Sequence, residues 1–476
     1  MPGSVGFQGK NARWRVPPDL SWPGILLDNG GGNGPMVPPP GAPRGGVDPG
    51  RMFARCPGLV ARMREMKLLV FAHTPPPVHG QSLMVERMIR CLGGDRQHVA
   101  RTQSGEAASA DPIEVFHVNA RLSLDAGDIG HIRWGKLFAL AGYCLQALGL
   151  MLQHGRMTLL YVPAPPKRAA VYRDWMVMAL CRPFSRGVVL YWHAAGLGDW
   201  LEKDARPWER WVCRRLLGRV ALSLVLSPSL GADAAHLSPR AIQVVANAIE
   251  DPCPDFDETI GPRRRERAAA RKQAMENPHA TTAAPADQRE VRVLYLALCT
   301  RTKGLFDAAE GVIEANRRLR ERGTPLTVTL SVAGAFSDPG EREEFARLAA
   351  GSGGTLRYLG FLDQRAKLAG LAAADLFCFP TYYANEGVPL ALIEAMAFGL
   401  PVVTTRWRGI ADYLPEGHLG VVEPRRPDQV ATALLALLES DGRGLRGRYL
   451  QEFTVGRYLK SLTDALGAMA PPRAIP

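Results

Sequence analysis

Residues 375–412 read DLFCFPTYYANEGVPLALIEAMAFGLPVVTTRWRGIAD, and we expect this stretch to form a strand, a glycine-containing loop, a helix and a second strand. The apolar run 376–380 is long enough for a buried strand. Apolar side chains then repeat at helical spacing over 390–397. Gly399 is suited to end the helix, and the next strand begins at Val402. Such a unit is typical of a parallel α/β sheet.

Two carboxylates occupy defined places in this pattern. Glu386 lies in the loop before the helix, and Glu394 lies inside the helix. Free backbone N–H groups at the positive end of a helix suit a phosphate, and the flanking carboxylates could bind sugar or ribose hydroxyls. The residues that would face such a ligand are Gly387, Val388, Pro389 and Leu390. By spacing alone, a solvated glutamate beside an ordinary helix start fits equally well.

Glu386, the seven residues that follow it, Glu394 and the string AMAFGLPVV resemble the E-x7-E region of the retaining glycosyltransferases of family 4. The resemblance is close over 375–412 and loose elsewhere between 67 and 465. It implies the GT-B architecture, an α/β fold of two Rossmann-like, doubly wound parallel-sheet domains that face a cleft. It also implies transfer of a sugar from a nucleotide-sugar donor to an acceptor hydroxyl with retention.

The composition agrees with a two-domain globular enzyme. A chain of 476 residues exceeds one ordinary core, and 46% hydrophobic with 22% charged residues is usual for a soluble protein. The net charge of +12 suits an anionic partner such as a nucleotide sugar or an anionic lipid surface. No motif for specific nucleic-acid binding is present. Eight scattered cysteines favour reduced thiols in the cytoplasm over disulfides or a zinc site.

Changes in composition divide the chain. The Gly/Pro-rich residues 1–65 are expected to be disordered, and translation is hypothesised to begin near Met63 or Met66. The further divisions are a first domain over 66–250, an extended linker, partly helical at most, over 251–290, a second domain over 291–450, and a helical region over 451–476. The family resemblance implies that the first domain is on the acceptor side, that the second binds the nucleotide sugar, and that the last helical region crosses back to the first domain.

The first domain offers two candidate positions. Gly80 follows the strand 68–72 in a loop that precedes a helix, a phosphate-friendly arrangement in which Ser82 could cap the helix. His193 follows the strand 187–192, at the end where parallel sheets bind ligands. The family resemblance implies that this histidine orients the transferred sugar. A lone histidine is otherwise more often structural.

The second domain offers charges for a diphosphate. Lys303 precedes Gly304 after the strand 291–296 and could act as a point charge on the phosphates, with Arg301 as a second, displaced candidate. A plain surface lysine is the alternative. The resemblance also implies that Glu386 contacts the sugar, that Glu394 holds the ribose, and that loops after two strands hold the base. Those loop residues are Gly334, Phe361 and Leu362. No D-x-D motif is evident, so we expect neither a metal nor another cofactor.

Two basic, apolar segments raise the question of a membrane. The helix expected over 134–153 is apolar on most sides but too short to span, so we expect it to be buried in the protein, with contact at an anionic membrane as the alternative. The helix over 207–217 interleaves arginines with Trp208 and Trp211, which suits an acidic lipid acceptor or simply a solvated face. We expect the chain to be cytoplasmic, with peripheral contact at the inner membrane face left open.

Three other functions fit the same residues. The chain could be a catalytically inactive nucleotide-sugar-binding protein. It could be a GT-B nucleotide-sugar epimerase that releases free sugar and UDP. It could also be a basic peripheral membrane-interaction protein. The sequence names neither the donor nor the acceptor, which could be a glycan, a glycolipid or a polysaccharide precursor.

Overall fold

A computed structural model describes residues 66–97, 113–122, 134–277 and 289–469. These residues all belong to one structural unit, Val47–Pro476. The expectations about residues 1–65, including the translation start, lie outside the described residues.

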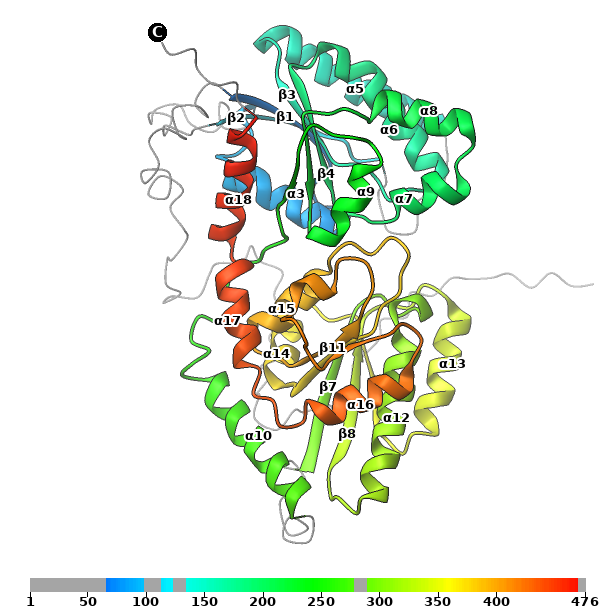
Figure 1. The fold of residues 1–476 in the computed structure, drawn as a ribbon, viewed down its shortest axis with the longest axis vertical. Coiled ribbons are helices and arrows are strands. Elements are labelled where there is room, and N and C mark those ends of the chain that lie inside the picture. The colour runs from blue at the N-terminus through cyan, green and yellow to red at the C-terminus, as the bar shows by residue number, and fades with distance from the viewer. Residues whose placement is uncertain (1–65, 98–112, 123–133, 278–288, 470–476) are drawn as a thin grey trace, which may run out of the picture. The chain divides into compact units, whose positions relative to one another are not determined.

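The described residues form two six-stranded sheets in which every strand pair is parallel (Figure 1). The first has the order β2-β1-β3-β4-β5-β6 and the second the order β12-β11-β10-β7-β8-β9. The strands of the first sheet are β1 (Met66–Ala72), β2 (Ile113–Asn119), β3 (Thr158–Tyr161), β4 (Gly187–Trp192), β5 (Leu222–Val225) and β6 (Ile242–Val244). Those of the second are β7 (Glu290–Leu296), β8 (Thr327–Ala333), β9 (Leu356–Gly360), β10 (Leu376–Phe379), β11 (Val402–Thr405) and β12 (Val421–Val422). The expected α/β fold class is confirmed.

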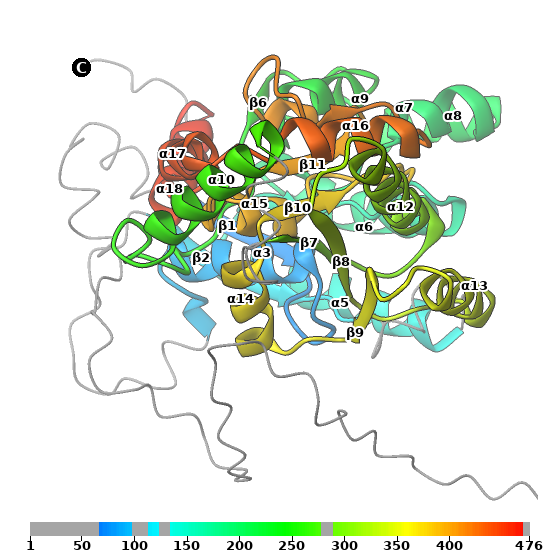
Figure 2. The ribbon, with the colours of Figure 1, turned by 90° about the horizontal axis from the view of Figure 1, so that it is seen from below.

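Helices cover both faces of the first sheet, because the chain reverses the direction in which it adds strands after β2 and parallel crossovers are right-handed. Helix α3 therefore lies on one face, and α5, α6 and α8 lie on the other (Figures 1 and 2). The helices here are α3 (Gly80–Cys91), α5 (Trp134–His154), α6 (Arg168–Cys181), α7 (Leu197–Asp199), α8 (Pro207–Leu216) and α9 (Gly231–Ala235).

The second sheet reverses between β7 and β10, so its helices also divide between two faces. Helices α12, α13 and α16 lie on one face, and α14 and α15 lie on the other (Figures 1 and 2). Their bounds are α12 (Leu305–Glu321), α13 (Pro339–Ala350), α14 (Gln364–Ala373), α15 (Leu390–Ala397) and α16 (Pro427–Ala436). Ligands of such sheets bind beyond the carboxyl ends of the strands, at the point of reversal.

Helix α5 corrects two sequence expectations. By length and composition it is able to cross a membrane over Gly135–His154, whereas a helix too short to span was expected. Only 28% of its apolar window is buried, whereas a helix buried in the protein was expected. Its inner stripe, which includes Cys144 and Ala147, is fully buried in the core. Its outer stripe, which includes Leu145 and Leu152, faces solvent. Apolar composition cannot distinguish these two environments, because both stripes have the same kind of side chain.

The segment between the sheets is also more ordered than expected. Within the segment 251–290, for which an extended linker, partly helical at most, was predicted, Ile260–Glu276 forms a packed helix, α10. Its arginines provide the packing: Arg267 Nε and Arg271 Nη1 donate to Asp375 Oδ1 at 2.7 and 2.9 Å. Burial by itself would raise the pKa of Asp375, but these two guanidinium groups hold it below its usual value. The packing of this helix could not be predicted from an apolar stripe, because buried arginines anchor it.

The chain ends in two helices, α17 (Arg443–Glu452) and α18 (Val455–Gly467). The segment between these two helices contacts the chain shortly after β6, where Ile249 N–H donates to Phe453 O at 3.1 Å. Helix α18 lies beside the first sheet (Figures 1 and 2). The exact domain boundaries stay a prediction.

Candidate functional site

Lys303 and Glu386 form the centre of the site. Lys303 lies in a short helical turn after β7, and its Nζ lies 2.6 Å from Glu386 Oε2, a contact between residues far apart in the sequence. Thr381 Oγ1 donates to the same carboxylate oxygen at 2.9 Å. Gly304 makes this turn possible, because it has φ +77° and a Cβ there would lie 2.1 Å from the Pro380 carbonyl. A buried carboxylate and a largely buried ammonium thus meet at the end of β10.

The start of α15 presents free donors beside this pair. Among the described residues, none accepts a hydrogen bond from the N–H groups of Gly387, Val388 or Leu390. Pro389 is the N-cap of α15. Unpaired N–H groups at the positive end of a helix are suited to an anion. These N–H groups directly follow Glu386, the partner of Lys303, and phosphate binding by them stays a prediction.

Glu394 has a partner that the sequence did not suggest. Lys367 on α14 places its Nζ 2.5 Å from Glu394 Oε1. Both side chains are mostly buried, with 22% and 15% of their surface exposed. Lys367 therefore positions the Glu394 carboxylate through Oε1, and Oε2 takes no part in this ion pair.

His193 lies on the first-sheet side. Its ring packs on Tyr191 with centroids 4.3 Å apart, and its buried Nε2 atom has no hydrogen-bond partner among the described residues. Desolvation, with a smaller effect of nearby His79, lowers its pKa to about 3. The imidazole is thus neutral near pH 7 and has a ring nitrogen free for a ligand.

The loop after β1 adds a pair of neutral imidazoles, those of His73 and His79. His73 Nε2 and His79 Nε2 lie 2.7 Å apart, and burial, followed by the charge of His79, lowers the pKa of His73 to about 4. His79 is the N-cap of α3 and accepts from Ser82 N–H through Nδ1. The predicted cap, Ser82, instead occupies the third helical position. Gly80 lies against Leu390, since a Cβ on this glycine would lie 3.8 Å from that side chain.

Backbone contacts join the two halves around Gly387. A Cβ on this residue would lie 2.2 Å from the His193 carbonyl oxygen, so only glycine allows the approach. Asn385 Nδ2 donates to Ala195 O at 3.1 Å, and Asn247 Nδ2 donates to Val388 O at 2.9 Å. The loop before α15 is thereby fixed to residues that follow strands of the first sheet.

Arg301 points elsewhere. Its Nη2 atom lies 2.6 Å from both carboxylate oxygens of Glu344 on α13, and its guanidinium stacks on Phe306. Lys303 shares none of these partners. The structure therefore does not bring Arg301 to Glu386, and it commits this side chain to an exposed ion pair.

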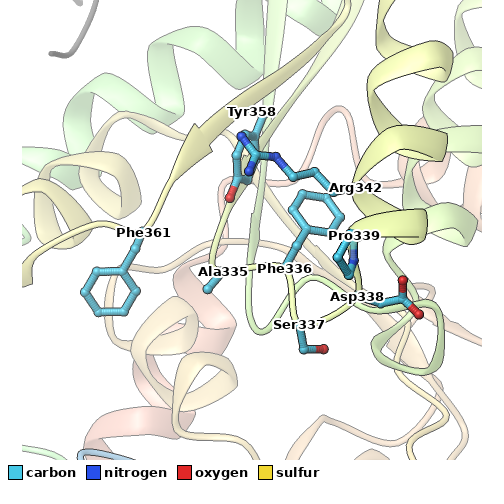
Figure 3. A pocket seen from close by; sticks show the side chains of 8 residues that line it. All are labelled: Ala335, Phe336, Ser337, Asp338, Pro339, Arg342, Tyr358 and Phe361. Atoms are coloured by element: carbon cyan, nitrogen blue, oxygen red, sulfur yellow. The ribbon is translucent and has the colours of Figure 1, made fainter. Parts of the chain in front are cut away.

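One of the three residues expected near a nucleotide base lines a hollow of about 330 Å³ (Figure 3). The Phe361 side chain lines this hollow and is 82% exposed. Gly334 immediately precedes the lining residue Ala335 in the sequence, and its carbonyl oxygen accepts from Tyr358 Oη at 2.9 Å. Leu362 does not line it and packs partly into the core. The lining side chains are Ala335, Phe336, Ser337, Asp338, Pro339, Arg342, Tyr358 and Phe361.

The site thus assembles Lys303, Glu386, the start of α15 and His193, and it leaves Arg301 outside. Sequence reasoning missed Lys367, Thr381 and Asn247. Lys367 and Asn247 meet their partners only through tertiary structure, whereas Thr381 contacts Glu386 within one loop. Among the described residues, no group of three or more His, Cys, Asp or Glu side chains could hold a metal ion. Metal independence stays a prediction.

Comparison with known proteins points to one family. The family described as "Glycosyl transferases group 1" matches residues 294–440, which include Lys303, Glu386 and Glu394. The phosphatidyl-myo-inositol mannosyltransferase of Mycobacterium leprae is 35% identical over 112 residues, 23% of this chain and 29% of the relative. The amylovoran biosynthesis glycosyltransferase AmsK of Erwinia amylovora is 32% identical over 155 residues, 31% of this chain and 36% of the relative. The matched region thus spans about a third of these curated relatives.

The fold is shared over a larger part of the chain. The crystal structure of Anabaena HepE in complex with UDP and glucose superposes with a TM-score of 0.54, at 15% sequence identity. It covers 85% of this chain and all of the HepE chain. At this identity the likeness shows the architecture alone. Residues 294–440 thus match the glycosyl transferases group 1 family, and the chain has the GT-B fold.

Proposed function

We propose that this protein is a retaining glycosyltransferase that moves a sugar from a nucleotide-sugar donor to an acceptor hydroxyl. The observation that carries the proposal is the Lys303–Glu386 pair at 2.6 Å beside the free N–H groups that begin α15. A cation and a helix start suit the diphosphate of a donor, and the carboxylate suits a sugar hydroxyl or a developing positive charge. HepE, which shares the fold, was crystallised with UDP and glucose.

In the proposed reaction, the bond between the anomeric carbon and the diphosphate oxygen breaks, and a bond to the acceptor oxygen forms. The acceptor proton passes to the released diphosphate. Lys303 and the α15 N–H groups would stabilise the leaving-group charge without a metal. The neutral His193 would form a hydrogen bond to the sugar, and Glu394, positioned by Lys367, would bind the ribose.

The names of two relatives support a proposal for the acceptor class. One is named for phosphatidyl-myo-inositol and another for amylovoran biosynthesis, so we propose a glycan, glycolipid or polysaccharide precursor as the acceptor. The chain would then act at the cytoplasmic side of a membrane, where nucleotide sugars are available.

A thermal-shift panel of UDP-, GDP- and ADP-sugars tests donor binding. One nucleotide class should raise the melting temperature of the parent protein, since a ligand that binds only the folded state stabilises it. Glu394→Ala should lose this shift, while Glu439→Ala, a change at an exposed glutamate, should keep it. If no nucleotide sugar stabilises the protein, the proposal fails.

Product analysis then separates transfer from the other activities of a donor-binding protein. With a labelled donor and a membrane lipid extract, label should appear in the acceptor fraction, and Glu386→Gln should abolish this. Free sugar and UDP without acceptor would indicate an epimerase. Donor binding without any product would indicate an inactive binding protein.

A further inference from the structure

The outer face of the first sheet carries an unusual amount of exposed apolar surface. On α5, the side chains of Phe138, Leu145 and Leu152 are 76%, 68% and 80% exposed. They recur every seven residues, so they lie along one stripe of the helix. Single exposed apolar side chains are ordinary, but an aligned set marks an interaction surface.

Neighbouring helices extend this stripe. Helix α6 packs between α5 and α8, and the three lie together on one face of the sheet (Figures 1 and 2). On α8, Trp208 and Trp211 are 49% and 68% exposed, and Phe184, just after α6, is 48% exposed. We call the exposed surface of α5, α6 and α8 the outer helical face.

The charged side chains exposed on the outer helical face are cationic. The only acidic residues in the three helices are Asp174 and Glu209, and both are buried. Asp174 accepts from Tyr161 Oη at 2.6 Å, and Glu209 accepts from Arg168 Nε at 2.8 Å. Arg214 and Arg215 on α8 are exposed. The outer helical face therefore presents apolar and cationic groups with no exposed carboxylate on its helices.

We propose that the outer helical face binds the surface of an anionic lipid bilayer, with α5 lying in the plane of the interface. Helix α5 is long and apolar enough to cross a membrane, with a mean hydropathy of 1.4, but its inner stripe is packed in the core. It can therefore lie on a bilayer without crossing it. Tryptophans favour the membrane–water interface, and arginines favour anionic headgroups.

Electrostatic complementarity favours an anionic bilayer over a second copy of the chain as the partner of the outer helical face. Gly135, Gly142 and Gly149 leave open space along α5, which would also admit another helix. Two identical faces would, however, bring like positive charges together, whereas an anionic bilayer complements them. The inference goes beyond sugar transfer and does not depend on it.

Sedimentation of the full chain with vesicles tests the proposal. The protein should sediment with phosphatidylcholine vesicles that contain phosphatidylglycerol, and much less with phosphatidylcholine alone or at high salt. Arg214→Gln/Arg215→Gln, which changes only exposed side chains, should weaken binding about tenfold or more. The matched pair Arg320→Gln/Arg322→Gln, exposed at the end of α12, should bind like the parent protein.

An apolar variant tests the other component of the surface. Leu145→Ser/Leu152→Ser should reduce sedimentation, while Leu419→Ser, a change at a leucine 65% exposed beside the second sheet, should not. Circular dichroism would confirm that each variant is folded. Equal binding by the Arg214/Arg215 variant and the parent would overturn the proposal. So would a parent dimer that dissociates in the α5 variant without any vesicle binding, because the occupant would then be a second copy.

Discussion

The two sheets contribute opposite chemistry to the candidate site. The second sheet supplies charge that is already paired, in Lys303 with Glu386 and Lys367 with Glu394. The first sheet supplies neutral imidazoles, in His193 and in the His73–His79 pair. A charged donor diphosphate needs fixed counter-charges, whereas a hydroxyl acceptor needs only hydrogen-bonding groups. The family match, which lies in 294–440, falls on the charged half.

The largest expected effect tests how the charged half is held together. Asp375→Asn should lower the free energy of unfolding by about 3–5 kcal/mol, because it leaves Arg267 and Arg271 without their shared buried carboxylate. Urea unfolding followed by fluorescence measures this. Asp464→Asn, in an exposed pair with Lys460, should change stability by less than about 1 kcal/mol. Equal effects would mean that α10 is not anchored by this network.

The next effect tests whether the charged half carries the chemistry. Glu386→Gln should lower kcat about 10²–10³-fold, since it removes a negative charge placed beside the reacting sugar. Initial rates of transfer with the identified donor measure this. Glu416→Gln, a change at an exposed glutamate, serves as the control. Undiminished turnover in Glu386→Gln would move the chemistry to the histidine half.

A smaller effect sharpens the assignment of Lys367 as a positioning residue. Lys367→Met should raise the donor KM about tenfold and change kcat little, because it frees the Glu394 carboxylate that would bind the ribose. Lys367→Arg should restore most of the affinity. Arg365→Met, exposed on the same helix, should have no effect. A fall in kcat alone would contradict a role in donor binding.

The smallest effect concerns the neutral half and depends on pH. Because the pKa of His193 is about 3 in the folded protein and 6.5 for an ordinary histidine, only the unfolded chain binds a proton between these values. The free energy of unfolding should therefore fall as the pH falls from about 6.5 towards 3. We expect a contribution of about 1–2 kcal/mol from His193, because part of its surface stays in contact with solvent. His193→Gln should flatten this dependence in urea titrations. An unchanged pH slope would show that the ring is not held neutral.

Much of the donor side could be predicted from local pattern. The strand, loop and helix around Glu386 form as expected, because apolar periodicity and the flanking glycines act over a few residues. Local pattern did not reveal the packing of α10 through buried arginines, or the ion pair of Arg301 with another helix. In both cases a distant charge decided the outcome.

The sequence by itself determined the alternation of strands and helices, the placing of Glu386 before a helix, and the presence of an apolar segment at α5. Only the tertiary structure decided that Lys303 meets Glu386, that Lys367 holds Glu394, and that one stripe of α5 faces outward. Periodicity is a local property of the chain. Ion pairs and exposure depend on which distant elements pack together, and that is settled only when the sheets and their covering helices assemble.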